Sequence, residues 1–374
     1  MNNNQEKIIF TDGSKLMTEA LVRAGADIFI GYPITPANLL YQYGSRRYPH
    51  FMAAPDEITT LQWMCGYAAS GLLPVTATSF PGFALMLESV NMAFMMELPM
   101  VIILVQRLGP ATGTATCGAQ GDISLLNGCI SGGYTLPVIS TSSMSDCWDM
   151  AEAALKLAAD LRSPVILLSS KEEVMTYRSF DINKLKHIDK VERKYYNGKE
   201  TYQPYRADEK LVPDFVSLQS KEHRLRLTAS THDKMGILQN TTPEALENTL
   251  RIHQKAIHNM DSYLYYEISE EADADVLLLS YGISSDACRE AQRNLNAAGK
   301  KVSLLIAKTL LPVHPLYYDI IAKYRHVVFV EENHQGLYKQ ILFGHQQVKN
   351  MSTVNAIGRM VYPSEIMEEV MRYV

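Results

Sequence analysis

The sequence lacks the cysteine patterns by which proteins bind zinc or iron–sulfur clusters. No two cysteines form a C-x-x-C pair, and no group of Cys and His has metal-site spacing. We therefore expect no metal site in this chain, and any redox metal would lie on another chain. The thiols suit a reduced, cytoplasmic protein, and they belong to Cys65, Cys117, Cys129, Cys147 and Cys288.

Long apolar runs and basic blocks are also lacking. Residues 1–7 are polar, unlike a signal peptide, and no stretch approaches the roughly 18 apolar residues of a membrane span. The run 92–105 comes nearest, but Glu97 and Pro99 interrupt it. The net charge is −5 and no block of Lys and Arg is present. We expect a protein that neither enters a membrane nor binds nucleic acid.

What the sequence does contain is a regular alternation of strand and helix patterns. A chain of 374 residues is long enough for two domains. The first alternation covers residues 1–176, a mostly polar connecting segment covers 177–270, and a second α/β unit covers 271–374. Four or more strand–helix units predict a doubly wound, mostly parallel sheet. The expected fold class is therefore α/β, with a second, smaller α/β domain.

Individual elements follow from local patterns. The aliphatic run 100–105 is typical of a strand covered on both faces, and Asp56 and Glu57 suit a helix start because acids stabilise helix N-termini. Residues 79–83 predict a turn before a helix over 84–96. The other expected helices cover 14–25, 37–43, 123–133, 145–161, 243–260, 284–298 and 364–373. The other expected strands cover 27–30, 50–54, 74–79, 136–140, 164–169, 276–280, 302–306 and 326–330.

A rigid bend follows the first buried strand, with the sequence Gly31-Tyr32-Pro33-Ile34-Thr35-Pro36. Pro33 and Pro36 fix their φ angles and remove two backbone donors. Each proline also pushes the residue before it towards extended geometry. Ligands of parallel α/β sheets bind at the carboxyl ends of the strands, so this bend is either a binding loop or a connection stiffened by prolines.

Four expected loops lie at such strand ends. They hold Thr35, Glu57, the turn 79–83 and Arg107. In a doubly wound sheet these loops converge on one crevice. The alternative for Glu57 is a first-turn acid that complements the helix dipole, and the alternative for Arg107 is a solvated arginine at a strand end.

A longer set of motifs extends in fixed order along nearly the whole chain. The motifs are Tyr32-Pro33-Ile34-Thr35-Pro36, Asp56-Glu57-Ile58, Thr76-Ala77-Thr78-Ser79-Phe80-Pro81-Gly82-Phe83, Gln106-Arg107-Leu108-Gly109-Pro110-Ala111-Thr112-Gly113, Thr116, Gln120-Gly121-Asp122, Arg226-Leu227-Thr228, His232-Asp233, Thr309-Leu310-Leu311-Pro312, Val330-Glu331-Glu332-Asn333 and Gly336. Together they resemble the α subunit of the 2-oxoacid:ferredoxin oxidoreductases. Phe80 and Leu108 stand where that family usually has Gly.

The resemblance implies a thiamine diphosphate enzyme. Residues 1–176 would bind the pyrimidine end of the cofactor, and residues 271–374 would form a domain of the transketolase C-terminal type. Thiamine enzymes place a carboxyl group against the N1′ nitrogen of the aminopyrimidine ring, which is acid–base catalysis through the cofactor. By resemblance, Glu57 takes this role. The other implied cofactor-binding residues are Tyr32, Pro33 and Ile34.

The resemblance also implies the substrate contacts. A guanidinium group binds a carboxylate through two hydrogen bonds, so Arg107 would hold the carboxylate of a 2-oxoacid. Thr35 would donate its hydroxyl to the same substrate, and these two residues complete the expected catalytic set with Glu57. Thr116 matches a family position near the far end of the substrate, unless it only bonds its own loop. Asp122 suits a helix cap better than a ligand.

The implied reaction is the oxidative decarboxylation of a 2-oxoacid. Intact Pro110-Ala111-Thr112-Gly113 and Thr116 favour 2-oxoglutarate. A partner β subunit would hold the diphosphate, Mg²⁺ and a [4Fe–4S] cluster, while CoA takes the acyl group and ferredoxin takes the electrons. A γ subunit would be separate or absent. The alternatives are a branched-chain 2-oxoacid or pyruvate oxidoreductase subunit, a thiamine-dependent 2-oxoacid decarboxylase component without electron transfer, and a non-catalytic assembly subunit.

Overall fold

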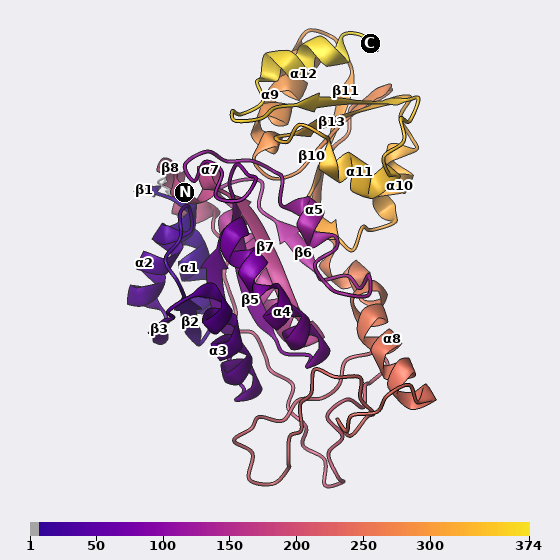
Figure 1. Ribbon diagram of the computed structural model, residues 1–374. Coiled ribbons are helices and arrows are strands. Elements are labelled where there is room, and N and C mark those ends of the chain that lie inside the picture. Colours follow the sequence, from indigo (N-terminus) through magenta and orange to yellow (C-terminus); the bar gives the residue numbers. More distant parts are fainter. Residues whose placement is uncertain (1–6) are drawn as a thin grey trace, which may run out of the picture.

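The larger of the two main sheets has seven strands and is mostly parallel. The computed structural model describes residues 7–374 (Figure 1). The strand order is β12-β6-β7-β5-β4-β2-β3, and only the β12–β6 pair is antiparallel. The strands are β2 (Ile28–Gly31), β3 (His50–Ala53), β4 (Pro74–Thr78), β5 (Met100–Gln106), β6 (Val138–Ser140), β7 (Pro164–Ser170) and β12 (Thr309–Leu311). The prediction of a mostly parallel sheet is confirmed.

Helices cover both faces of this sheet because side chains of a strand point alternately to its two faces. On β5, Ile102 and Leu104 pack with α3 and α4, whereas Val101 and Ile103 pack with α1 and α6 on the other face. The sheet is thus doubly wound, as predicted. The helices of this unit are α1 (Gly13–Ala24), α2 (Asn38–Arg47), α3 (Glu57–Ala69), α4 (Phe80–Met95), α5 (Ile123–Leu126), α6 (Asp146–Leu161) and α7 (Lys171–Met175).

The second sheet is smaller and belongs to the C-terminal part of the chain. Its strand order is β14-β13-β10-β11-β9, and only β9 is antiparallel to its neighbour. The strands are β9 (Tyr266–Ser269), β10 (Val276–Ser280), β11 (Val302–Ala307), β13 (His326–Glu331) and β14 (Met351–Asn355). The helices of this part are α8 (Pro243–His258), α9 (Ser284–Ala297), α10 (Leu316–Ile321), α11 (Leu337–Phe343) and α12 (Pro363–Val370). A two-stranded ribbon joins β1 (Ile8–Thr11) to β8 (Arg178–Asp181).

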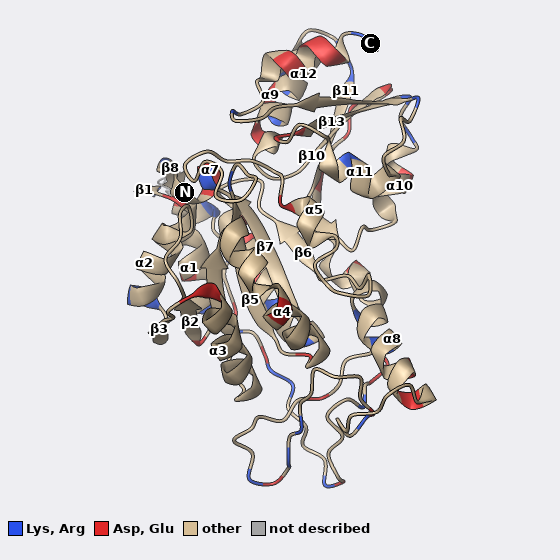
Figure 2. Ribbon diagram, viewed as in Figure 1, with Lys and Arg blue, Asp and Glu red and all other residues tan. Residues whose placement is uncertain are grey.

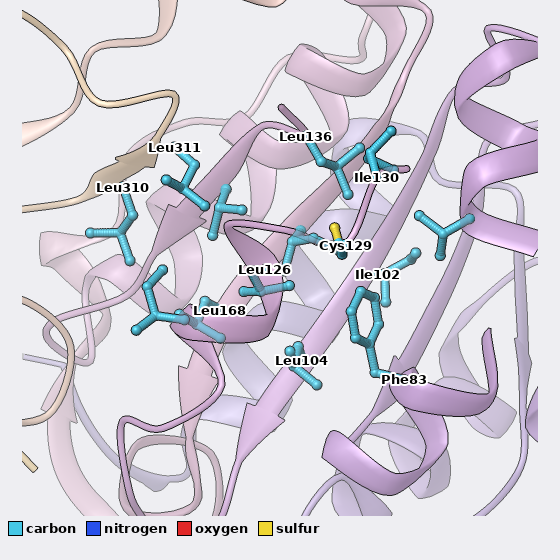
Figure 3. Close-up of a cluster of buried hydrophobic side chains, with 14 of the residues drawn as sticks. Phe83, Ile102, Leu104, Leu126, Cys129, Ile130, Leu136, Leu168, Leu310 and Leu311 are labelled. Atoms are coloured by element: carbon cyan, nitrogen blue, oxygen red, sulfur yellow. The ribbon is translucent and has the colours of Figure 1, made fainter. Parts of the chain in front are cut away.

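The two sheets share one apolar cluster. Figure 3 shows Phe83 of α4 and Ile102 of β5 in the same cluster as Leu310 and Leu311. The last two residues belong to β12, which follows the second sheet's β11 in the chain and yet pairs with β6 of the first sheet. The cluster therefore fixes the C-terminal unit against the first sheet.

Two predicted elements are wrong at their boundaries. Residues 80–83, expected as a turn, form the first turn of α4, because proline is compatible with the first turn of a helix. The helix expected over 123–133 ends after Leu126. The sequence pattern does not predict β14, because its residues are only half-buried and carry little apolar periodicity.

None of the helices within residues 7–374 combines the length and the apolarity needed to cross a bilayer.

A buried ion cluster anchors the connecting segment. Between residues 185 and 242, a stretch described in full, the chain forms only turns and isolated bridges, with charges of both signs interspersed (Figure 2). Glu97, which follows α4 and is fully buried, accepts hydrogen bonds from Lys255 (2.6 Å) and Arg251 (2.7 Å) of α8. Arg251 also donates to the Leu211 carbonyl of the segment at 2.9 Å. Burial raises the pKa of Glu97, but the two cations outweigh it and hold that pKa well below its ordinary value.

We expect Glu97→Gln to lower the free energy of unfolding by about 3–5 kcal/mol, because it leaves two buried cations without their counter-ion. Urea denaturation of the purified chain measures this. The matched control is Asp160→Asn, which breaks the exposed Lys156–Asp160 pair and should cost about 0.5 kcal/mol or less. Equal losses for both variants would show that the Glu97 cluster does not anchor the segment.

Candidate active site

The carboxyl ends of β2, β3, β4 and β5 meet at one edge of the first sheet, because these strands pair in parallel. Thr35 lies after β2, Glu57 after β3, Ser79 after β4 and Arg107 directly after β5. This is the edge at which open α/β sheets bind ligands. The structure thus brings the expected site loops to one edge of the sheet.

Arg107 and Thr35 are in direct contact. The Nη1 atom of Arg107 donates to the main-chain carbonyl of Thr35 at 2.6 Å. The arginine is only 6% exposed, and its buried Nε–H has no partner among the described residues. A buried donor without an acceptor costs free energy, so the guanidinium retains capacity to bind an incoming acceptor.

Glu57 is the first residue of α3. The Asp56 side chain caps this helix by accepting a hydrogen bond from the Thr59 N–H at 2.6 Å, as predicted for a cap. Glu57 is 7% exposed, and within residues 7–374 its carboxylate accepts no hydrogen bond. The carboxylate is therefore nearly buried and still has its full capacity to bind a donor.

Gly82 of α4 makes room for this carboxylate. A Cβ atom at Gly82 would lie 2.7 Å from both Cγ and Oε1 of Glu57, and 2.2 Å from Oγ1 of Thr78. Since real Cβ atoms essentially never approach this closely, a side chain at position 82 would force Glu57 or Thr78 to shift. The close approach of α3 and α4 is what places the carboxylate at the sheet edge.

The remaining expected site residues lie on the surface around this edge. Tyr32 is 41% exposed, Pro33 is also exposed, and Ile34 is half-buried. Thr116 lies exposed in the loop after β5, and no hydrogen bond of the described chain joins it to Arg107 or Thr35.

Gln120 and Asp122, at the end of this loop, are both buried, which the sequence did not predict. Gln120 is fully buried and bonds to the C-terminal unit: its Nε2 donates to the Tyr281 carbonyl at 2.6 Å, and its Oε1 accepts from the Glu332 N–H at 2.7 Å. Asp122 precedes α5, but its side chain caps no helix N–H, so the expectation of a helix cap is wrong. Its carboxyl is buried instead, and burial raises its pKa to about 7 against the opposing effect of Arg107. The motif Gln120-Gly121-Asp122 was the signal that could have pointed to both.

Comparison with known proteins gives the family. The model of the pyruvate flavodoxin/ferredoxin oxidoreductase thiamine diphosphate-binding domain matches residues 19–270. The chain belongs to this oxidoreductase family.

Relatives within this oxidoreductase family match nearly end to end. The 2-oxoglutarate synthase subunit KorA of Methanocaldococcus jannaschii is 29% identical over 97% of this chain and 98% of its own length. The KorA subunit of Methanothermobacter thermautotrophicus (strain Delta H) is 30% identical over 81% of each chain. A solved structure, the 2-oxoglutarate:ferredoxin oxidoreductase of Magnetococcus marinus with 2-oxoglutarate, coenzyme A and succinyl-CoA bound, superposes with a TM-score of 0.91 at 28% identity. This chain covers 65% of that longer chain, and 98% of this chain is matched.

The residues at the sheet edge fit the cofactor that this oxidoreductase family binds. A ring nitrogen needs a carboxylate that the protein itself leaves unpaired, and Glu57 is such a carboxylate within the described part of the chain. Gly82 lets this carboxylate lie directly against α4, because a side chain at that position would meet it. Within the described residues, no group of three or more His, Cys, Asp or Glu side chains could hold a metal ion.

Substitution of Gly82 tests this packing. Gly82→Ala forces a methyl group against Glu57 and Thr78, so we expect a loss of about 1–3 kcal/mol in unfolding free energy and at least a tenfold loss of thiamine diphosphate affinity in the assembled complex. The control is Gly66→Ala, in an exposed part of α3 where a Cβ meets nothing within 4 Å. This control should be neutral or slightly stabilising. Unchanged cofactor affinity in Gly82→Ala, measured by calorimetry, would contradict the packing described here.

Proposed function

We propose that this chain is the α subunit of a thiamine diphosphate-dependent 2-oxoacid:ferredoxin oxidoreductase of the cytoplasm. It would act on 2-oxoglutarate and CoA to give the acyl-CoA, CO₂ and reduced ferredoxin. The observation that carries the proposal is that two nearly buried groups lie at the same sheet edge: the Glu57 carboxylate, which accepts no hydrogen bond among the described residues, and the Arg107 guanidinium. The names of the relatives support 2-oxoglutarate as the substrate.

Arg107 is the residue that binds and orients the substrate. Its Nη1 is already held by the Thr35 carbonyl, which fixes the plane of the guanidinium. A planar guanidinium held in this way presents its remaining N–H groups to a carboxylate with little loss of conformational freedom. The Thr35 hydroxyl is next to this contact and would donate to the same substrate.

Glu57 is the residue that holds and moves a proton. Its carboxylate would receive the N1′ nitrogen of the aminopyrimidine ring, beside Tyr32, Pro33 and Ile34. When bound, thiamine diphosphate supplies the carbon nucleophile that adds to the 2-oxo group and the electron sink for loss of CO₂. The carboxylate is only 7% exposed, and this near-burial keeps water away from the proton that it shares.

The rest of the site comes from another chain in this proposal. Large apolar side chains lie exposed around the Glu57 edge, among them Tyr32 (41%), Ile58 (44%) and Leu85 (52%). A β subunit packed on this surface would carry the cofactor's diphosphate, Mg²⁺ and a [4Fe–4S] cluster, and a γ subunit would be separate or absent. We retain the division into residues 1–176 for pyrimidine binding, 177–270 as connector and 271–374 as the transketolase C-terminal-like domain. Thr116 remains proposed for the far end of the substrate.

Co-purification with the β subunit, followed by assay of CoA-dependent viologen reduction, tests the proposal. We expect activity with 2-oxoglutarate, and we expect Glu57→Gln to lower kcat by about 10²- to 10⁴-fold because an amide cannot exchange the proton. Glu88→Gln, which changes an exposed residue of α4, serves as the control. Activity with pyruvate or a branched-chain 2-oxoacid alone would redirect the substrate assignment. A full-rate Glu57→Gln complex would favour a non-catalytic subunit.

Substitution of Arg107 separates binding from chemistry. Arg107→Gln removes the charge that holds the substrate carboxylate, so we expect KM for 2-oxoglutarate to rise by about 10²-fold while kcat changes less. The control is Arg46→Gln, on the exposed side of α2. Steady-state kinetics at saturating CoA measure both constants. An unchanged KM in Arg107→Gln would place the substrate carboxylate elsewhere.

A further inference from the structure

The loop that follows Arg107 is closed by its own main chain. The Leu108 N–H donates to the Cys117 carbonyl at 2.8 Å, and the Leu108 carbonyl accepts from the Thr114 N–H at 2.8 Å. The Cys117 N–H donates to the Thr114 carbonyl at 3.1 Å. A loop with joined ends and internal contacts of this kind is compact. Thr116, the residue proposed for the far end of the substrate, is an exposed member of this loop and is carried with it.

The two ends of this loop are attached to different parts of the molecule. The first end continues from β5 of the first sheet, where Arg107 donates to the Thr35 carbonyl. Towards the other end, the Gly118 N–H donates to Oε1 of Glu172 on α7 at 3.0 Å. The last attachment is at Gln120, which is fully buried. The place of the loop therefore depends on the first sheet and on the groups that bind Gln120.

Each polar atom of Gln120 forms a hydrogen bond with the C-terminal unit. Its N–H donates to the Glu332 carbonyl at 2.8 Å, and its carbonyl accepts from the Tyr281 hydroxyl at 3.1 Å and from the Asn333 amide at 3.2 Å. Its Nε2 donates to the Tyr281 carbonyl at 2.6 Å, and its Oε1 accepts from the Ser284 hydroxyl and from the Glu332 N–H. Because loss of any partner would leave a buried polar group unsatisfied, these contacts fix both the position and the orientation of Gln120.

We propose that Gln120 is a positioning residue for substrate specificity: it fastens the loop to the C-terminal unit and so holds Thr116 at a fixed separation from Arg107. A 2-oxoacid is then selected by its length and by the polar group at its far end. This inference rests on the proposed function, because it concerns the same 2-oxoacid site. Neither the description of the family model nor the names of the relatives give Gln120 a role.

Loss of this attachment should affect one end of the substrate more than the other. Arg107 keeps its place at the end of β5 and its own hydrogen bond to the Thr35 carbonyl. Thr116 moves with the loop. A site built to bond a polar group of its substrate discriminates strongly against an analogue that lacks the group. Displacement of Thr116 should therefore reduce the preference for 2-oxoglutarate over 2-oxobutyrate, which has no second carboxylate.

Steady-state kinetics of the complex with the partner subunit test this preference. For Gln120→Ala we expect the ratio of kcat/KM for 2-oxoglutarate to kcat/KM for 2-oxobutyrate to fall about tenfold, mostly through KM for 2-oxoglutarate. A smaller amount of folded complex would lower both values equally and leave the ratio unchanged. The control is Arg289→Ala, which removes a 2.9 Å hydrogen bond to the Ser142 carbonyl, a contact between the two units outside the loop. This control should keep the parent's ratio.

Hydrogen exchange followed by mass spectrometry tests the loop itself, without substrate. In Gln120→Ala we expect at least tenfold faster exchange over residues 108–118 than in the parent complex. The physical reason is that the N–H groups of Leu108, Thr114 and Cys117 are hydrogen-bonded within the closed loop. Residues 100–106 of β5 should keep the parent's exchange rate.

A milder variant keeps the inference testable where Gln120→Ala fails to assemble. A Cβ atom at Gly282 would lie 2.9 Å from Nε2 of Gln120, so Gly282→Ala displaces that side chain without removing it. The matched control is Gly299→Ala, because Gly299 also has a positive φ and its Cβ would meet nothing within 4 Å. We expect Gly282→Ala to lower the substrate ratio about threefold and Gly299→Ala to leave it unchanged.

The contrary outcomes separate this inference from the proposed function. An unchanged substrate ratio in every assembled variant of Gln120 and Gly282 would overturn the inference, even with faster exchange of the loop. Unchanged exchange in an assembled Gln120→Ala complex would also overturn it, because other contacts would then hold the loop. Either result leaves the proposed function intact. A parent complex that oxidises none of the 2-oxoacids would overturn the proposed function together with this inference.

Discussion

The hydrogen bond between the Arg107 guanidinium and the Thr35 carbonyl is the contact on which the site depends. It joins the loops after β5 and β2, two strands separated in the sheet only by β4. Because all three strands are parallel and their interiors are buried, their ends cannot shift independently. The rigid proline bend thus presents a carbonyl at a fixed place, and the strand end presents the arginine to it. The geometry of the site follows from the packing of the sheet.

The buried charged side chains are of two kinds: some are paired with opposite charges, and others have hydrogen-bonding capacity that the described residues leave unused. Glu97 is satisfied by Arg251 and Lys255, and its ion pairs tie the connector and α8 to the first sheet. Glu57, Arg107 and Asp122 are buried to a similar degree, and yet each has capacity that the described part of the chain leaves unused. Buried polar groups without partners are costly. Glu57 and Arg107 lie at one sheet edge, and this supports the proposal that the edge receives ligands, whereas the Glu97 cluster stabilises the fold.

Much of the fold could be predicted from local patterns, whereas long-range pairings could not. The mostly aliphatic β5, the Asp56 cap and the glycine after α1 each specify structure within a few residues. The predicted start of α4 was wrong because a proline that looks like a turn also fits a first helical turn. No local pattern could reveal that β12 pairs with β6, or that Gln120 bonds to Glu332 across more than 200 residues. The proposal that Thr35, Glu57 and Arg107 are site residues came from the order of motifs along the chain. The burial of Asp122 came only from the structure.

The most direct measurement is an experimental structure of this chain assembled with its β subunit, thiamine diphosphate and 2-oxoglutarate. We expect the Glu57 carboxylate within about 3 Å of the N1′ nitrogen and the substrate carboxylate on the Arg107 guanidinium. A cofactor bound away from Glu57 would contradict the proposed role of this carboxylate. A substrate carboxylate bound by another residue, with Arg107 hydrogen-bonded only to the Thr35 carbonyl, would contradict the proposed role of the guanidinium.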